Sequence, residues 1–187
     1  MKILLLSKYS RLGASSRLRY LQYIPYLEKS GVEVVVNSLF DDVYLKHLYS
    51  SGKRPVFRSI YCYLVRFFAL FTVRKYDVIL IEKEVFPYFP ATVERLLRVF
   101  APPYVVDYDD AIFHNYDLSS NSLIRKILGR KIDVVMRNAR CVIAGNDYLA
   151  NRATAAGAKD VVVVPTVVDK SRYLAKRDAS SQSLVIG

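Results

Sequence analysis

The fold of this chain follows from residues 3–16, which read Ile-Leu-Leu-Leu-Ser-Lys-Tyr-Ser-Arg-Leu-Gly-Ala-Ser-Ser. The first five, four apolar residues and Ser7, show no alternation of apolar and polar residues, which predicts a strand buried on both faces. After the small-residue loop, apolar residues recur at threes and fours until Gly31 ends a predicted helix. Strand, loop and helix in this order open a doubly wound α/β domain, whose ligands bind at the carboxyl ends of the strands. Ser15 or Ser16 is placed to cap the helix and leave its first amides free for a ligand.

The rest of the chain repeats this alternation of strand and helix. Strands are predicted at 33–38, 76–82, 104–108, 141–145 and 160–164, and helices at 41–50, 56–73, 91–100, 122–138 and 146–156. Such spacing predicts an α/β, Rossmann-like fold with a parallel sheet of about six or seven strands and helices on both faces.

Composition limits the class of protein. A chain of 187 residues, 52% of them apolar, is long enough for one globular domain with its own core. Cys62 and Cys141 lie in separate apolar runs, which favours reduced thiols in a cytosolic protein over the alternative of a disulfide. The apolar run at the N-terminus is too short for a signal peptide.

The net charge of +11 indicates an anionic partner. The positive charge gathers at 53–75, which contains no acidic residue, and at 125–140. The sequence lacks a glycine-aromatic RNA motif and a helix-turn-helix signature, so we expect no nucleic-acid partner. An anionic membrane surface or a phosphorylated ligand is the expected alternative.

The basic segment contains a long apolar helix, residues 56–73. Arg58 and Arg66 lie within it, and each would cost roughly 2.5–3.5 kcal/mol at the centre of a bilayer, which argues against a membrane span. Two interpretations remain: a helix in the membrane interface, or a sheet-covering helix with a narrow polar stripe. For the first we assign the membrane-surface residues Arg54, Arg58, Arg66, Arg74 and Lys75.

The densest acidic segment follows the strand at 104–108. Asp107 is placed to bond local amides, whereas Asp109 and Asp110 can accept hydrogen bonds from sugar hydroxyls or act as a general base. His114 can transfer a proton near neutral pH. Aspartates after strands also cap helices, but three carboxylates in four residues exceed what one cap needs. An Asp-x-Asp spacing is too common to predict a metal site by itself.

The first loop supplies the candidate binding residues. It lacks G-x-G-x-x-G, and the second strand ends in Asn37 with no acid placed to bind a ribose, so a nicotinamide enzyme is not expected. Small residues and arginines at a helix N-terminus suit a phosphate, carboxylate or sugar, although a tight turn also explains Gly13. The candidate donor- or acceptor-binding residues are Gly13, Ala14, Ser15, Arg17, Asp107 and Asn146, the last also being a helix cap candidate.

Three segments carry a resemblance to a known family. They are Gly-Ala-Ser-Ser-Arg at 13–17 with Gly-Val-Glu-Val at 31–34, the acidic strand end at 107–113, and Val-Val-Val-Pro-Thr-Val-Val-Asp at 162–169. The last is similar to the family pattern V-x-P-N-G-V-D, with Thr166 and Val167 in place of Asn-Gly. The chain thereby resembles, over nearly its whole length, the GT-B glycosyltransferases of the large group-1 class, retaining enzymes that use nucleotide sugars.

The resemblance implies the N-terminal half of a GT-B architecture. Residues 1–169 would be the acceptor-side domain, 170–183 a linker, and 184–187 the first strand of a second domain that binds most of the donor. Asp109 takes the place of a family histidine, with His114 further on, and the loop at Gly13 would face the donor diphosphate.

The resemblance also implies a function. The intact protein would be a hexosyltransferase that needs no metal and no cofactor beyond its donor, and that acts on cell-envelope or lipid-linked glycans at the cytoplasmic face of the cell membrane. The chain alone would be inactive, because catalysis requires the missing C-terminal domain. The alternative is a non-catalytic module of the same fold that binds a membrane or a partner.

Overall fold

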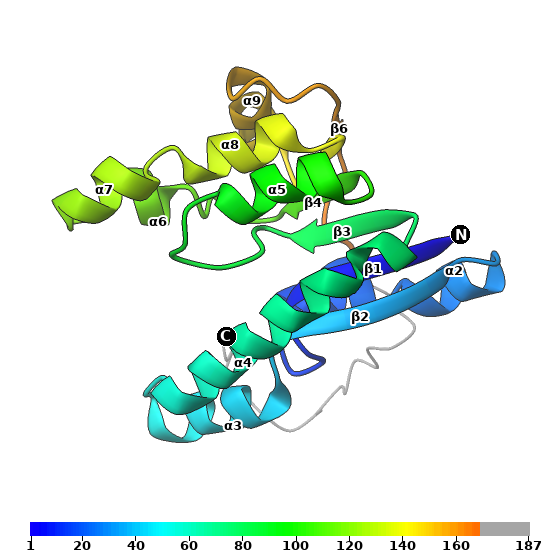
Figure 1. Cartoon of the computed structure of the whole chain (residues 1–187), viewed down its shortest axis with the longest axis horizontal. Coiled ribbons are helices and arrows are strands. Elements are labelled where there is room, and N and C mark those ends of the chain that lie inside the picture. Colours follow the sequence, from blue (N-terminus) through cyan, green and yellow to red (C-terminus); the bar gives the residue numbers. More distant parts are fainter. Residues whose placement is uncertain (169–187) are drawn as a thin grey trace, which may run out of the picture.

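Six strands form one parallel sheet in the order β2-β1-β3-β4-β5-β6 (Figure 1). The computed structural model describes residues 1–168. The strands are β1 (Lys2–Tyr9), β2 (Glu33–Phe40), β3 (Val78–Glu82), β4 (Tyr104–Tyr108), β5 (Cys141–Ala144) and β6 (Val161–Val163). The predicted α/β, Rossmann-like class is confirmed. The predicted linker at 170–183 and the strand at 184–187 lie outside the described residues.

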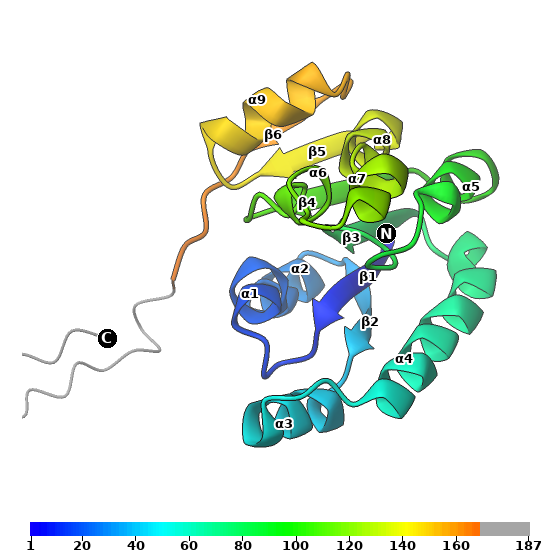
Figure 2. The ribbon, with the colours of Figure 1, turned by 90° about the vertical axis from the view of Figure 1, so that its left-hand side faces the viewer.

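Helices cover both faces of this sheet (Figure 2). They are α1 (Ala14–Ser16), the π-helical η1 (Arg17–Leu21), α2 (Ile24–Lys29), α3 (Asp42–Ser51), α4 (Val56–Ala69), the 3-10 helix η2 (Leu70–Lys75), α5 (Thr92–Phe100), α6 (His114–Asp117), α7 (Ser122–Leu128), α8 (Lys131–Asn138) and α9 (Asp147–Ala155). The chain runs from β1 out to β2, returns past β1 to β3 and then continues in one direction. Because such crossovers are right-handed, α1 and α2 lie on one face and α4, α5 and α8 on the other.

The predicted first helix is broken in the structure. Pro25 lies in the first turn of a separate helix, α2, because a proline further inside a helix would remove one backbone hydrogen bond. The predicted serine cap is wrong, since Gly13 occupies the N-cap position and no side chain caps α1. A Cβ atom at Gly13 would lie 2.3 Å from the Cβ of Tyr9, so the loop folds back too closely for any other residue.

The predicted helix at 122–138 is also two helices, α7 and α8, which meet at Gly129 and Arg130. Gly129 lowers helix propensity at this point, and the break lets the two helices take different directions. Asn121 caps α7 by accepting a hydrogen bond from the amide of Leu123 at 2.9 Å.

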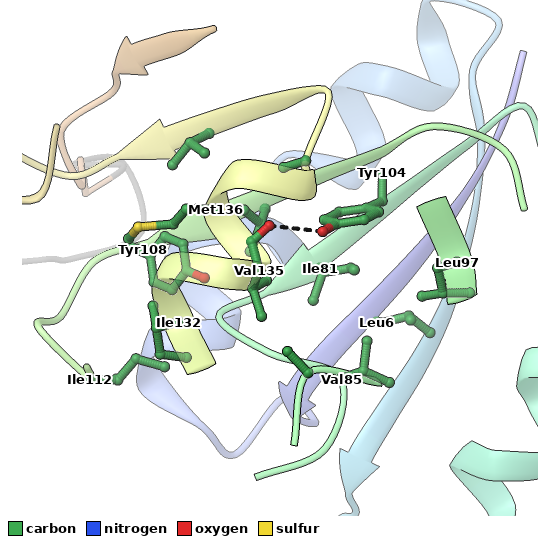
Figure 3. Close-up of a cluster of buried hydrophobic side chains, with 14 of the residues drawn as sticks. Leu6, Ile81, Val85, Leu97, Tyr104, Tyr108, Ile112, Ile132, Val135 and Met136 are labelled. Carbon is green, nitrogen blue, oxygen red and sulfur yellow. Dashed lines mark hydrogen bonds between the residues drawn. The ribbon is translucent and has the colours of Figure 1, made fainter. Parts of the chain in front are cut away.

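The main core lies between the sheet and the helices α5 and α8 (Figure 3). Ile81 and Val106 from the central strands pack there with Val135 and Met136 from α8, all essentially without solvent exposure. Tyr104 satisfies its buried hydroxyl by donating to the carbonyl oxygen of Val135 at 2.8 Å (Figure 3).

A smaller core lies beneath α3 and α4 and contains Leu39, Phe40, Tyr44, Leu45 and Cys62. Both cysteines of the chain are free thiols, as predicted. Burial raises the pKa of the Cys62 thiol, which favours its neutral form. This cysteine therefore acts as a small apolar core residue.

Candidate functional site

The strand order creates one switch point, between β1 and β3. The connection from β1 leads to one side of the sheet and the connection from β3 to the other, so the loops after these strands diverge at the carboxyl edge. In open α/β sheets ligands bind in the crevice at such a point. The loop after β1 brings Ser15 and Ser16 to it, β3 brings residues 82–84, and the neighbouring β4 brings residues 107–110.

Four side chains meet here and form what we call the polar cluster: Ser15, Lys83, Asp109 and Asp110. The Lys83 ammonium group lies 2.8 Å from Oδ1 of Asp109 and 2.6 Å from Oδ2 of Asp110. The hydroxyl of Ser15 donates a hydrogen bond to Oδ2 of Asp109. The ammonium thus occupies the position between the carboxylates that a divalent cation would need. Within residues 1–168, no group of three or more His, Cys, Asp and Glu side chains is arranged to hold a metal ion.

The charges of this cluster are fixed by its contacts. Burial acts to raise the pKa of Asp109, but the hydrogen bonds from Lys83 and Ser15 outweigh it and hold that pKa below its usual range. Burial acts to lower the pKa of Lys83, and the two carboxylates reverse this effect. Both groups are therefore charged at neutral pH. Asp109 can act as a hydrogen-bond acceptor or a general base, but not as an acid.

The backbone at Lys83 is strained. Its φ angle is +67°, in the left-handed region that non-glycine residues rarely adopt, and its amide donates to the carbonyl oxygen of Asp107 at 3.0 Å. Lys83 directly follows β3, and this turn directs its side chain back over the end of β4. Strain of this kind is concentrated at functional sites.

Asp107 is buried beneath the cluster. The prediction that it bonds local amides is wrong. Asp107 instead accepts two hydrogen bonds from Arg19, from Nε at 3.0 Å and from Nη2 at 2.5 Å. Nη1 of Arg19 donates to the carbonyl oxygen of Val164 at 2.6 Å. This buried bidentate pair joins η1 to β4 and to the segment after β6, so Asp107 supports the site from below and is not open to a ligand.

Glu82 is a second buried carboxylate at the switch point. Its Oε2 accepts from the amide of Lys8 at 2.7 Å and from the hydroxyl of Ser16 at 2.6 Å. Its Oε1 has no hydrogen-bond partner in the described part of the chain. Burial raises the pKa of Glu82, because the charged form loses its hydration.

This shift predicts a specific pH dependence of stability. The folded state binds a proton at Glu82 more tightly than the unfolded state does. Glu82 therefore decreases the free energy of unfolding as the pH rises. This decrease begins near the usual glutamate pKa and ends above the raised pKa of Glu82 in the folded protein. In Glu82→Gln, which cannot ionise, this decrease should be absent. Urea unfolding of both proteins between about pH 4 and pH 8 measures the difference. A constant difference across this range would show that Glu82 is not perturbed.

Three further predicted site residues form their contacts outside the cluster. His114 bonds through Nδ1 to Asp117 at 2.9 Å and through Nε2 to the hydroxyl of Tyr148 at 2.8 Å, so its contacts are with α6 and α9. Asn146 caps α9 by accepting from the amide of Leu149 at 3.0 Å. Arg17 is exposed and donates to a carbonyl oxygen of its own loop, that of residue 11, at 3.0 Å.

The polar stripe of α4 faces the protein, and this corrects the prediction for Arg66. Arg66 is only 1% exposed and donates to the carbonyl oxygens of Ser7 at 2.6 Å and Asn37 at 2.7 Å. Burial lowers its pKa to about 9, so it remains charged at neutral pH but cannot reach a membrane. Arg58 remains half-exposed and pairs with Asp41.

The apolar side of the same helix therefore faces outward. By length and composition alone, Val56–Lys75 is long and apolar enough to cross a membrane. Arg66 fixes this helix against the sheet. The end of α5 lies beside the end of η2, because Arg74 donates to the carbonyl oxygen of Phe100 at 2.9 Å, and α5 therefore continues the exposed surface of α4. We call this surface the apolar face; its exposed members include Phe57, Leu64, Phe68, Phe71, Val99 and Phe100.

Lys83, Glu82 and the role of Arg19 were not predicted from the sequence. For the first two a signal was present, because Glu82 ends a buried strand and Lys83 directly follows it, much as Asp109 and Asp110 follow β4. Arg19 had no such signal, since nothing local distinguishes it from Arg17. The chain matches no protein-family model and no curated protein sequence.

Proposed function

We propose that this chain is the acceptor-side domain of a retaining glycosyltransferase, which moves a hexose-type unit from a nucleotide sugar to a cell-envelope or lipid-linked glycan. The polar cluster at the β1/β3 switch point carries the proposal. It combines an ionised carboxylate, an ammonium group and a hydroxyl at the edge where α/β sheets bind ligands. Such groups suit a sugar, whose hydroxyls donate to Asp109 and accept from Lys83 or Ser15. The resemblance to GT-B enzymes supports the same class.

Within this proposal the residues have distinct roles. Asp109 accepts a hydrogen bond or a proton from a sugar hydroxyl, because its carboxylate is ionised and only partly buried. Lys83 holds that carboxylate in place and in its charged form. The loop at Gly13 faces the donor diphosphate, as the resemblance implies. Its glycine is required because Tyr9 fills the space that a side chain at this residue would need. The donor itself is bound mostly by a second domain, and closure of the two domains completes the site.

The apolar face supports a peripheral location on the inner surface of the cell membrane. The helical segment that forms it carries four cations within it or at its ends, namely Arg54, Arg58, Arg74 and Lys75. Cations beside exposed aromatic side chains bind anionic interfaces. The same observation favours the alternative function, a non-catalytic membrane-binding module. Enzyme turnover separates the two.

The deciding experiment compares the chain with the same protein extended by whatever its gene encodes after Gly187. Each is incubated with a panel of nucleotide sugars, with and without a membrane extract as the source of acceptor. We expect turnover by the extended protein and none by the chain ending at Gly187, and the product should keep the anomeric configuration of the donor. An extended protein that neither binds nor consumes any nucleotide sugar would refute the transferase proposal and leave the membrane-binding module.

A further inference from the structure

A large aromatic groove opens beside the polar cluster. It has a volume of about 840 Å³, within the range of small-molecule sites, and lies between α3, α4 and the segment that follows β3. Tyr63 of α4 lines it, and the centroid of its ring lies 5.5 Å from that of Phe86, 5.8 Å from that of Phe89 and 6.1 Å from that of Phe40. We call it the aromatic groove. Its wall is mostly apolar, yet water reaches it, since Leu64 and Phe89 are each about half exposed.

The groove is continuous with two features already described. Leu64 and Phe67 belong both to its wall and to the exposed side of α4 that forms the apolar face. At its other side the groove is lined by Glu84, the residue after Lys83 of the polar cluster. A molecule in the groove therefore extends from the proposed membrane surface to the proposed sugar site.

The charged side chains of the groove favour an anion. Glu84 is already neutralised, because Lys131 pairs with it and the hydroxyl of Tyr116 donates to it at 2.9 Å. Lys8 and Arg54 also line the groove, and neither forms an ion pair within residues 1–168. Burial and the charge of Lys83 lower the pKa of Lys8, so an anion beside this lysine would stabilise its charged form.

We propose that the aromatic groove holds the hydrocarbon chain of a membrane lipid phosphate, with the phosphate between Lys8 and Arg54. The inference rests on the membrane part of the proposed function and specifies the acceptor: the chain leaves the bilayer across Leu64, and the head group meets the polar cluster. An apolar chain matches the aromatic wall, and a phosphate matches the two unpaired cations. A neutral or cationic amphiphile lacks the second match.

Binding of a single lipid-like molecule tests this without a membrane. The probe is dodecyl phosphate below its micelle concentration, titrated into the protein by calorimetry, with inorganic phosphate and dodecyl maltoside as comparisons. We expect dodecyl phosphate to bind at one site and more tightly than either comparison. Arg54→Gln should weaken the binding of dodecyl phosphate by about tenfold, as expected for a lost charge-assisted hydrogen bond, and leave the binding of dodecyl maltoside unchanged. Lys53→Gln, the neighbouring exposed cation outside the groove wall, is the matched control and should have little effect.

Two variants of α4 separate the groove from the apolar face. Leu64→Glu should weaken the binding of dodecyl phosphate by about 10- to 100-fold, because it places a carboxylate against the hydrocarbon chain of the ligand. Phe68 lies one turn further along α4 on its exposed side and is outside the groove wall as the structure describes it. Phe68→Glu should weaken binding to anionic vesicles and leave the binding of dodecyl phosphate unchanged.

The outcomes distinguish the inference from the function on which it rests. Equal binding of inorganic phosphate and dodecyl phosphate, equal losses in Leu64→Glu and Phe68→Glu, or no binding of dodecyl phosphate would each overturn the groove assignment. Sugar transfer to a water-soluble acceptor by a protein that does not bind dodecyl phosphate would overturn the groove and keep the transferase. Binding at one site without any turnover would keep the groove and refute the transferase.

Discussion

Arg19→Met should lower the free energy of unfolding by about 3–5 kcal/mol, the loss typical of removing one partner from a buried ion pair. Arg19 and Asp107 are both almost fully buried and joined by two hydrogen bonds, so the variant leaves a carboxylate without a partner inside the protein. It also removes the donor to the carbonyl oxygen of Val164. Urea unfolding followed by circular dichroism measures the change.

The chain provides a matched control two residues away. Arg17 lies in the same helical turn but is exposed, and Arg17→Met should change the stability by less than about 0.5 kcal/mol. The double variant Arg19→Met with Asp107→Leu removes both charges and should recover most of the loss, since it leaves no unpaired buried charge. Equal stability of Arg19→Met and Arg17→Met would contradict the buried pair. An absence of recovery in the double variant would assign the loss to packing instead.

Asp109→Asn should reduce the rate of sugar transfer by the extended protein by about 10²–10⁴-fold. Asparagine keeps the shape of the side chain and its bond to Ser15 but removes the charge that binds Lys83 and that a base requires. Because Asp110 also pairs with Lys83, the ammonium keeps one partner and the fold should persist. Steady-state kinetics together with a thermal unfolding curve separates the effect on catalysis from one on stability.

A control for this variant lies on the opposite edge of the sheet. Asp160 pairs with Arg140 near the amino end of β6 and is more than half exposed. Asp160→Asn should therefore leave the transfer rate unchanged. If Asp109→Asn transfers sugar at the wild-type rate, the polar cluster is not the reacting site, and His114 becomes the next residue to test.

Much of the fold was predictable because burial in a parallel sheet leaves a direct trace in the sequence. Residues 3–7, 78–82 and 104–108 are almost continuous apolar runs, and each is a central strand. The edge of the sheet where Asp109 and Asp110 lie follows from the same pattern, because polar residues that directly follow parallel strands meet at one edge. The predicted bounds of the helices were less accurate where a residue such as Pro25 or Gly129 interrupts a periodic run of apolar residues.

The direction of α4 shows where the sequence pattern was insufficient. Arg58 and Arg66 were predicted to lie at a membrane surface or in a narrow polar stripe on a sheet-covering helix. In the structure the stripe faces inward, because the carbonyl oxygens of Ser7 and Asn37 offer Arg66 acceptors at the end of the sheet. These acceptors come from strands 29 or more positions away in the sequence, so no local periodicity could reveal them.

The sequence by itself thus determined the strands, their parallel arrangement and the edge at which acidic side chains gather, since these depend on local runs of apolar and polar residues. Only the tertiary structure decided which charges pair: Arg19 with Asp107, and Lys83 with Asp109 and Asp110. It also decided that the apolar side of α4 is exposed and that an aromatic groove opens beside it. The physical reason is distance along the chain. Ion pairs and cavities form between segments brought together by strand order, and their energies depend on burial that no single segment specifies.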